Sequence, residues 1–278
     1  MKFNPEDLKK LYKRPNDSKG EDNGQTVIIG GSTLFHGAPL MSLRVASRVV
    51  DMVFFASPEK TLEEVVSYMK ADLGAFIWVP WGEIDEYIKK SDSVLIGPGF
   101  MRYRNGEGKD HNEDDCDEAC MLTKTVTNSL LEKFPDKKWV IDAGSLHLLD
   151  KNKIPKNSIL TPNDSEYEAL FGDMDPLKAS EEFNCVIVRK GVVGQVYASG
   201  VEVEIEGGNA GLTKGGTGDV QAGLTASFLA KNDPLLSACA ASFIVKKTAE
   251  KLEETIGTYF NSDDLADSIP AVLASYTK

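Results

Sequence analysis

The stretch LTKGGTGDVQAGLTASFLA, residues 212–230, places three glycines and a threonine directly before Asp219. Apolar residues recur at helical spacing after Asp219, so the glycines lie at the amino end of a predicted helix. Such an end has unpaired amides and a positive dipole, and glycine lets a ligand approach the backbone. The stretch therefore predicts an anion-binding loop beside a carboxylate. A flexible turn with Asp219 as a helix cap fits the same residues and stays open at this point.

The loop at 215–219 differs from two common nucleotide-binding motifs. No Gly-Lys-Ser/Thr triplet follows its glycines, so it is not a P-loop, and no G-x-G-x-x-G follows an early strand. An anion site at this loop therefore needs support from residues elsewhere in the chain.

Upstream of this stretch, short β-rich runs alternate with helical patterns. The predicted strands are 26–30, 52–56, 75–79, 93–97, 139–143, 158–161 and 185–190. The predicted helices between them are 37–50, 61–71, 117–133 and 163–171. Several strands are apolar at consecutive positions, which is typical of strands that are buried on both faces. The alternation predicts an α/β fold with a largely parallel sheet and crossover helices on both faces.

Two regions depart from this alternation. The runs 195–199 and 201–206 predict an antiparallel hairpin or a meander at one edge of the sheet. The last third of the chain predicts helices, from about Asp219 to the end, with a break near Gly257 and Asn261. Neither an internal repeat nor a linker divides the chain, so the sequence predicts one large domain.

Residues of the types that bind ligands follow five of the predicted strands. They are Gly30-Gly31-Ser32, Gly97-Pro98-Gly99, Asp142, the group Thr161, Asn163 and Glu166, and Lys190-Gly191. Each of them fits an ordinary turn by itself. Because open α/β sheets bind ligands at the carboxyl ends of their strands, we expect the five ends to form one site.

The composition limits the partners and the location. A formal net charge of −12 disfavours a broad nucleic-acid or anionic-membrane surface, because both partners need a positive field. Small phosphorylated ligands remain possible, since local amides and one or two cations hold them. No apolar run is long enough to cross a bilayer, and the amino terminus lacks the apolar core of a signal peptide. We therefore expect a cytoplasmic protein.

The cysteines are expected to be reduced thiols, because a chain of this size in a reducing compartment does not need disulfides. They are Cys116, Cys120, Cys185 and Cys239. A metal site formed by His111, Cys116 and Cys120 in the acidic segment 104–120 is disfavoured, since zinc sites normally use two ligand pairs and this C-x3-C pair has no partner pair. We interpret the segment as a solvated acidic loop.

Six motifs follow one another along the chain: VIIGGS, LIGPGF, VIDAGSL, ILTPNDSE, VIVRKG and GGNAGLTKGGTGDVQAGL. In these motifs and their order the sequence resembles, nearly end to end, the ADP/ATP-dependent NAD(P)H-hydrate dehydratase family, which has a ribokinase-like fold and is related to carbohydrate kinases. The resemblance implies a single ribokinase-like domain, a three-layer α/β/α sandwich with a largely parallel central sheet. It also implies dehydration of hydrated NADH or NADPH with ADP or ATP and Mg²⁺.

The resemblance implies roles for individual residues. Asp219 would be the catalytic base that takes the proton of the substrate's ring hydroxyl, with an anion hole formed by Gly216, Thr217 and Gly218. The nucleotide would contact Lys190, Gly191, Asn209 and Gly218. The hydrated nicotinamide substrate would contact Ala38, Gly99, Asn163 and Asp219. Glu166 would not bind Mg²⁺ directly but would contact the groups that do. A homo-oligomer, a tetramer by analogy with the family, is also implied.

Several positions depart from the family pattern, mostly on the substrate side. Asn163 stands where histidine is usual, Met101 replaces a glycine, Phe35-His36 stand near an expected tyrosine, and Gln221 stands where leucine is common. A kinase of the same fold, acting on a hydroxymethyl or sugar-like hydroxyl, stays open, because Asn163-x-x-Glu166 fits the Asn-x-x-Glu pattern of such kinases. A non-catalytic nucleotide-binding protein is a second alternative.

Overall fold

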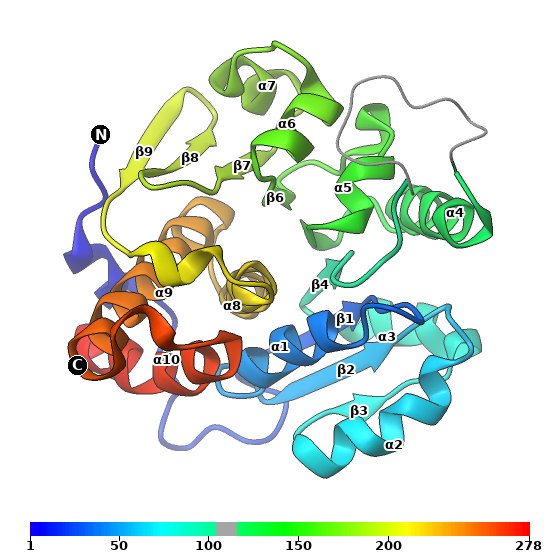
Figure 1. Cartoon of the computed structure of the whole chain (residues 1–278), viewed down its shortest axis with the longest axis horizontal. Coiled ribbons are helices and arrows are strands. Elements are labelled where there is room, and N and C mark those ends of the chain that lie inside the picture. Colours follow the sequence, from blue (N-terminus) through cyan, green and yellow to red (C-terminus); the bar gives the residue numbers. More distant parts are fainter. Residues whose placement is uncertain (104–115) are drawn as a thin grey trace.

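The computed structural model describes residues 1–103 and 116–278, which contain a nine-stranded sheet between two layers of helices (Figure 1). The strands are β1 (Gln25–Ile29), β2 (Met52–Ala56), β3 (Ile77–Trp78), β4 (Ser93–Ile96), β5 (Lys138–Ile141), β6 (Ile159–Leu160), β7 (Val186–Arg189), β8 (Gly194–Ala198) and β9 (Val201–Ile205). Their order in the sheet is β3-β2-β1-β4-β5-β6-β7-β8-β9. Strands β1 to β7 pair in parallel, and β8 and β9 form an antiparallel hairpin at one edge. The predictions of a largely parallel sheet and an edge hairpin are therefore confirmed.

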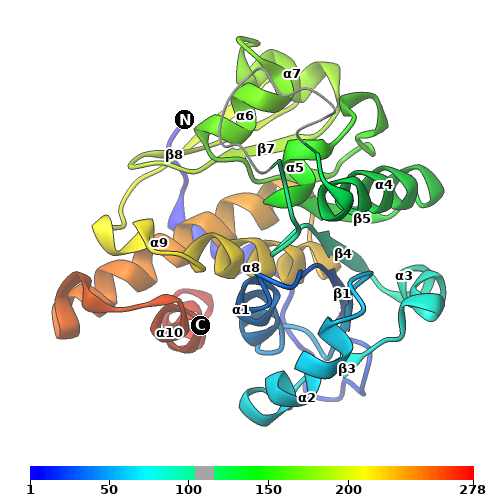
Figure 2. The ribbon, with the colours of Figure 1, turned by 45° about the vertical axis from the view of Figure 1, so that its right-hand side comes forward.

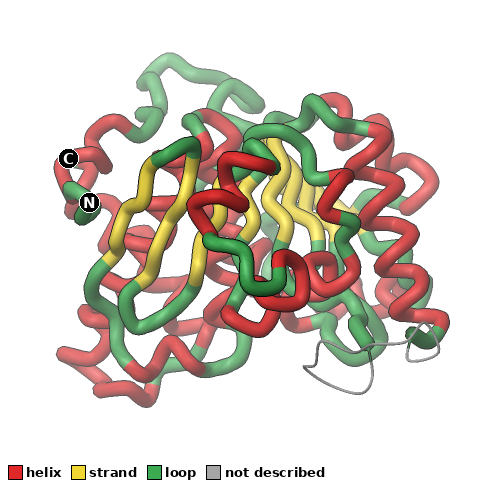
Figure 3. The backbone as a smooth tube through the Cα atoms, turned by 90° about the horizontal axis from the view of Figure 1, so that it is seen from above, coloured by secondary structure: helices red, strands yellow, loops and turns green. Residues whose placement is uncertain are grey.

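Helices cover both faces of the sheet (Figure 3). One side carries α1 (Gly37–Ala46), α2 (Leu62–Asp72), α8 (Thr217–Lys231), α9 (Pro234–Ile256) and α10 (Ser262–Thr277). The other carries α3 (Ile84–Lys90), α4 (Glu118–Lys133), α5 (Gly144–Leu148), α6 (Asp164–Phe171) and α7 (Pro176–Glu182). In β1, Ile28 packs into the first core while Val27 and Ile29 pack into the second, because successive side chains point to opposite faces. The three-layer α/β/α sandwich is confirmed.

Helices α1 and α8 lie side by side over the sheet (Figures 1 and 2). A Cβ on Gly223 of α8 would lie 2.6 Å from the Cα of Ser42 in α1, so only glycine allows this close approach. At this distance the Ser42 hydroxyl donates a hydrogen bond of 2.8 Å to the backbone oxygen of Asp219. The packing of α1 thus fixes the start of α8, where the predicted anion loop lies.

The helix predictions were incomplete in the last third of the chain and between the strands. The predicted break near Gly257 is present, but α8 and α9 are also separated at Asn232 and Asp233. Asp233 caps α9 with a hydrogen bond of 2.9 Å from the amide of Leu236, and Pro234 cannot donate the bond that would continue α8. Helices α3, α5 and α7 were not predicted. Within the described residues, none of the helices has both the length and the apolar character needed to span a bilayer.

The expectation of four reduced thiols was wrong for two of them. Cys116 and Cys120 form a disulfide where the chain enters α4, with their Cα atoms 5.2 Å apart. Cys116 lies one residue before the N-cap Asp117, and Cys120 lies in the first turn of α4. Their Cα separation is within the range that disulfides bridge. Cys185 and Cys239 are free and buried, as expected for small hydrophobic side chains. His111, the third member of the disfavoured metal site, lies outside the described residues.

Candidate active site

A cavity of about 830 Å³ lies at the carboxyl ends of β5 and β7 and is closed on one side by the start of α8. The predicted site residues that line it are Asn163, Glu166, Lys190, Gly191, Asn209, Gly216, Thr217, Gly218 and Asp219. Asp142, at the end of β5, also lines it. Three of the five predicted strand ends and the glycine loop, far apart in the sequence, therefore meet at one cavity, whereas Gly30-Gly31-Ser32 and Gly97-Pro98-Gly99 do not line it.

The glycine loop has the geometry of an anion site. Gly216 is the N-cap of α8 and has a left-handed backbone with a φ of 88°, which favours glycine. Thr217, Gly218 and Asp219 form the first turn. Helix geometry leaves the backbone amides of Gly218 and Asp219 without intrahelical partners, while the Thr217 amide donates to the Lys214 carbonyl at 3.4 Å. Asp219 is the third residue of the helix and not its cap, so the interpretation of a simple aspartate-capped turn was wrong.

Side chains of the loop hold its shape. The Thr217 hydroxyl donates to the carbonyl oxygens of Leu212 and Lys214 at 2.7 and 2.8 Å, so the threonine closes the loop with its side chain. The Lys214 ammonium donates to the carbonyls of Thr258 and Phe260, which lead into α10. The loop is thus tied to its own start and to the carboxyl-terminal helix.

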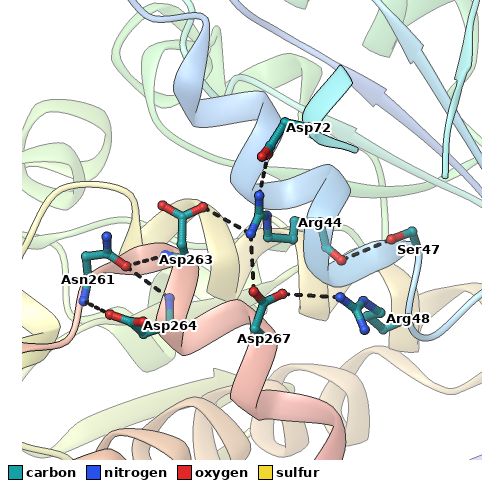
Figure 4. Close-up of polar contacts among 8 residues, drawn as sticks. All are labelled: Arg44, Ser47, Arg48, Asp72, Asn261, Asp263, Asp264 and Asp267. Carbon is teal, nitrogen blue, oxygen red and sulfur yellow. Dashed lines mark hydrogen bonds and ion pairs between the residues drawn. The ribbon is translucent and has the colours of Figure 1, made fainter. Parts of the chain in front are cut away.

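Helices α1 and α10 support the loop from the other side. A Cβ on Gly216 would lie 2.6 Å from the Ser262 Oγ, so the first residue of α10 is in direct contact with the N-cap of α8. Arg44 of α1 holds α10 in place, because its Nη1 lies 3.3 Å from Asp263 Oδ1 and 3.2 Å from Asp267 Oδ2 (Figure 4). Its Nη2 also pairs with Asp72 at the end of α2. One arginine thus joins three helices beneath the loop.

Replacing Arg44 with Met is expected to lower the free energy of unfolding by about 1–3 kcal/mol. The Arg44 side chain is only 14% exposed, and its loss leaves the three aspartates to repel one another. Arg48→Met is the matched control, because Arg48 is 48% exposed and pairs with Asp267 alone. Urea unfolding of both variants measures the difference. Equal stability of the two variants would contradict a structural role for the three-helix contact.

The carboxylates of Asp142, Glu166 and Asp219 interact with the Lys190 ammonium in the cavity. Lys190 Nζ lies 2.8 Å from Asp142 Oδ1, and that oxygen also accepts a hydrogen bond of 2.7 Å from the Thr161 hydroxyl. A Cβ on Gly218 would lie 3.5 Å from the same ammonium, so Lys190 stands directly over the anion loop. The loop amides and Lys190 together form a positively charged surface suited to an anion such as a phosphoryl group.

The surroundings of Asp219, Lys190 and Glu166 shift their pKa values in different directions. Burial, followed by the charge of Asp142, raises the pKa of Asp219 to about 7, against the opposing charge of Lys190. Burial opposes the charge of Lys190, but Asp142 and Glu166 outweigh it and raise the pKa of the ammonium. Burial also opposes the charge of Glu166, and His147 with Lys190 outweighs it and lowers the pKa of that carboxyl. Asp219 is therefore the carboxylate that can exchange a proton near neutral pH.

Asn163 and Glu166 form a capping box at the start of α6. The Asn163 Oδ1 accepts a hydrogen bond of 2.8 Å from the backbone N–H of Glu166. In return, the Glu166 Oε2 accepts one of 2.9 Å from the backbone N–H of Asn163. The other oxygen, Oε1, lies 3.5 Å from the Nε2 of His147. Helix capping alone accounts for the Asn-x-x-Glu spacing, so the pattern does not by itself indicate a kinase. Both residues also line the cavity.

Two segments form the far wall of the cavity. Gly191 follows β7, and Asn209 caps the short 3-10 helix Ala210–Thr213, with its Oδ1 accepting from the Gly211 amide at 2.9 Å. The Asn209 amide group also donates to the carbonyl of Ala249 in α9 at 2.8 Å. Lys246 of α9, which no sequence motif indicated, lines the same wall. It lies within a long helix of otherwise mostly apolar buried positions.

Ala38 and Gly99 do not line this cavity. A Cβ on Gly99 would lie 2.2 Å from the carbonyl oxygen of Phe35 and 3.1 Å from the Cα of Gly31, so Gly99 packs against the loop before α1. Ala38 is half-buried in the first turn of α1. In the same loop, the side chains of Leu34 and Phe35 are 68% and 52% exposed. The two residues therefore lie together in a second region, joined to the cavity through α1 and Asp219, and their contact with a substrate stays a prediction.

The described part of the chain holds no group of three or more His, Cys, Asp and Glu side chains placed to bind a metal ion. In the cavity, oxygen donors suited to a hard cation are present in Asp142 and Glu166. Asp142 is already bonded to Lys190, and Glu166 to the Asn163 amide. The donor set fits a divalent ion that takes most of its ligands from a bound phosphate and from water.

Known proteins resemble the chain over most of its length. The family model described as NAD(P)H-hydrate dehydratase matches residues 26–271. The bifunctional NAD(P)H-hydrate repair enzyme Nnr of Methanocaldococcus jannaschii is 35% identical over 276 residues, covering 96% of this chain and 51% of that protein. The ADP-dependent (S)-NAD(P)H-hydrate dehydratase of Cenarchaeum symbiosum is 27% identical, covering 98% of this chain and 96% of that protein. The chain thus spans about half the length of the bifunctional relatives.

Among solved structures, the ADP/ATP-dependent NAD(P)H-hydrate dehydratase of Bacillus subtilis, co-crystallized with ATP and Mg²⁺, superposes with a TM-score of 0.76 at 20% identity. The two structures cover 99% of this chain and 98% of that one, which supports the same fold. From the match of the family model and the identity to the Methanocaldococcus protein, the chain belongs to the NAD(P)H-hydrate dehydratase family.

Proposed function

We propose that this chain dehydrates hydrated NADH and NADPH in a reaction that consumes ADP or ATP. The observation that carries the proposal is the position of Asp219, whose pKa is raised to about 7, in the turn of α8 that also supplies the anion-loop amides. Lys190 stands over the same loop. A base and a phosphoryl site are therefore adjacent, as a transfer to a hydroxyl group requires.

In the proposed reaction, Asp219 accepts the proton of the ring hydroxyl while the hydroxyl oxygen attacks the terminal phosphorus of the nucleotide. The bond from that phosphorus to its bridging oxygen breaks, which releases AMP from ADP or ADP from ATP. Phosphate then leaves the ring with the electron pair of the carbon–oxygen bond. Loss of a proton from the neighbouring ring carbon restores the double bond. The loop amides and Lys190 stabilise the negative charge on the phosphoryl group during transfer.

Mg²⁺ is part of this proposal. The ion neutralises phosphate charge when it is bound, and Glu166 would hold its waters and not the ion itself, because one oxygen of Glu166 already accepts from the Asn163 amide. Lys190 and the loop amides keep the phosphate in place, and Asp142 holds Lys190.

The test of the proposed function is the absorbance of regenerated NADH. The protein is mixed with enzymatically hydrated NADH, Mg²⁺ and either ADP or ATP, with reactions lacking nucleotide as the control. The expected result is a rise that depends on the nucleotide and shows which one is used. No rise with either nucleotide would contradict the proposal.

A kinase of the same fold is the second candidate, favoured by Asn163 in the place of the family's usual histidine. It predicts that nucleotide is consumed in the presence of a hydroxymethyl or sugar-like alcohol and that a stable phosphate ester accumulates. Mass spectrometry of the products separates the two candidates, because the proposed dehydratase releases free phosphate and leaves no ester.

The ionisation of Asp219 is expected to determine how kcat/KM rises on the acid side of its pH profile. The residue acts as a base only when ionised, so kcat/KM should rise with pH through about 7, the value that burial and the charge of Asp142 produce. Asp142→Asn removes that negative charge and should move the acid limb to lower pH. Asp164→Asn is the control, because Asp164 is exposed and pairs with Arg189. If the acid limb of kcat/KM lies at the same pH in Asp142→Asn as in wild type, the assignment of this limb to Asp219 is contradicted.

The organisation of the whole protein belongs to the same proposal. A single ribokinase-like domain over residues 1–278, a cytoplasmic location, and the lack of nucleic-acid and membrane partners stay predictions. A homo-oligomer, with a tetramer expected from the family, also stays a prediction. Light scattering after size-exclusion chromatography separates a monomer from a tetramer.

A further inference from the structure

Lys246 of α9 is a buried cation whose hydrogen bonds, within the part of the chain that the structure describes, all go to backbone oxygens. The residue is only 7% exposed. Its ammonium donates to the carbonyls of Gly191, Val192 and Gly207 at 3.0, 2.7 and 3.0 Å. A lysine ammonium has three protons to donate, so these contacts use its full capacity.

Burial disfavours the charged form of Lys246. Burial lowers the pKa of Lys246, and the charge of Glu250 opposes the shift only in part. Glu250 is instead bonded to the Gly208 amide at 2.9 Å and to Lys247 at 2.8 Å. A buried cation is costly unless its hydrogen bonds are made, so the three carbonyls are what keep Lys246 in place.

The three carbonyls belong to two segments that are separate in the sequence. Gly191 and Val192 form the turn between β7 and β8, directly after Lys190. Gly207 lies after β9, in the segment that leads through Asn209 to the anion loop. Both segments line the cavity, so Lys246 joins the two segments of its far wall at one point.

Two glycines make room for the lysine stem. A Cβ on Gly194 would lie 3.2 Å from Lys246 Cε, and a Cβ on Gly208 would lie 3.1 Å from Lys246 Cγ. These contacts are tight for side-chain carbons. The backbone at Gly194 and at Gly208 therefore packs closely against the Lys246 stem.

We propose that Lys246 is a positioning residue for the nucleotide, which it serves by holding the turn 191–193 and the segment 207–209 at the separation that ADP or ATP needs. The proposal rests on the nucleotide dependence of the proposed function. It assigns Lys246 no part in the chemical step, since its ammonium bonds only to backbone. Removing it should weaken nucleotide binding and leave phosphoryl transfer from bound nucleotide largely intact.

The test compares Lys246→Met with wild type by calorimetric titration of ADP and ATP with Mg²⁺, without any acceptor. The Kd of the nucleotide used by the enzyme should rise on the order of tenfold or more, as expected for loss of hydrogen bonds to a charged group. In turnover assays KM for that nucleotide should rise likewise, with kcat at saturation within about threefold of wild type.

Lys137→Met is the matched control. Lys137 also donates to two backbone carbonyls, those of Lys89 and Ser91 at 2.6 and 2.7 Å, and burial lowers its pKa too. It precedes β5, at the amino ends of the strands and away from the cavity. Its substitution should leave the nucleotide Kd unchanged.

Two further measurements keep the test decisive. Hydrogen exchange at 191–193 and 207–209 should be faster in folded Lys246→Met than in wild type. If that variant does not fold, Gly194→Ala, which crowds the lysine stem, should raise the nucleotide Kd by at least about threefold.

A merely structural role would lower Tm and the active fraction without changing Kd, and an unchanged Kd in the folded variants would overturn the proposal. Wild type that binds neither ADP nor ATP would overturn the proposed function and this role together.

Discussion

Asp219→Asn is expected to lower kcat by about 10³-fold, within the range that a general base contributes. Asparagine has nearly the same shape but cannot take the proton of the attacking hydroxyl. Nucleotide binding should persist, because the loop amides and Lys190 are unchanged. The measurement is single-turnover kinetics with hydrated NADH beside a titration of nucleotide. A variant that keeps wild-type kcat would remove Asp219 from the role of base.

The stability of the same variant is the control against unfolding. The pKa of Asp219 is about 7 in the folded protein and 3.8 is its ordinary value, so the folded state holds a proton that the unfolded chain releases between these values. The contribution of Asp219 to stability is therefore present below about pH 4 and is lost as pH rises through about 7. Asparagine carries no charge to bury. At pH 8, Asp219→Asn should melt at the same temperature as wild type or higher.

Lys190→Met is expected to lower kcat/KM by about 10²- to 10³-fold, as removal of one preorganised donor does at other sites of charge development. The ammonium is bonded to Asp142, stands over the anion loop and opposes the raised pKa of Asp219. Without it, the phosphate loses this cation, and Asp142, Glu166 and Asp219 lose the positive charge with which all three interact. The acid limb of the pH profile should therefore also move to higher pH, opposite to the shift expected for Asp142→Asn.

Lys190→Arg separates the two effects. The guanidinium keeps the positive charge, so the acid limb should stay near that of wild type, while the larger planar group fits the loop less well and kcat/KM should still fall. The pH–rate profiles of wild type and the two variants measure both quantities. Wild-type kcat/KM in Lys190→Met, or an unmoved acid limb in that variant, would contradict the arrangement of charges described for the cavity.

Much of the fold and the place of the cavity could be predicted because the strands and the helix start leave local signals in the sequence. Apolar runs such as 93–97 correspond to buried strands, and the glycines before Asp219 mark a helix start. The meeting of Lys190 with the anion loop followed from the general position of ligands at strand ends and needed no further signal.

The remainder depends on contacts between segments that no short pattern records. Lys246 bonds to backbone carbonyls, which every residue has, so its partners leave no trace in the side-chain sequence. The Asn163-x-x-Glu166 pattern was ambiguous because a capping box and a magnesium-related motif use the same residues at the same spacing. Ser42 holds Asp219 only because Gly223 lets two helices approach.

The most direct test of the central claim is the ratio of inorganic phosphate released to NADH formed, measured in one reaction with hydrated NADH, Mg²⁺ and the nucleotide that supports turnover. The account predicts one phosphate for each NADH. The Asp219→Asn variant should form both products only at the rate, about 10³-fold lower, that is expected without the general base. Phosphate release or nucleotide loss without NADH would contradict it, and so would NADH formation without phosphate, because then no phosphoryl transfer precedes the elimination.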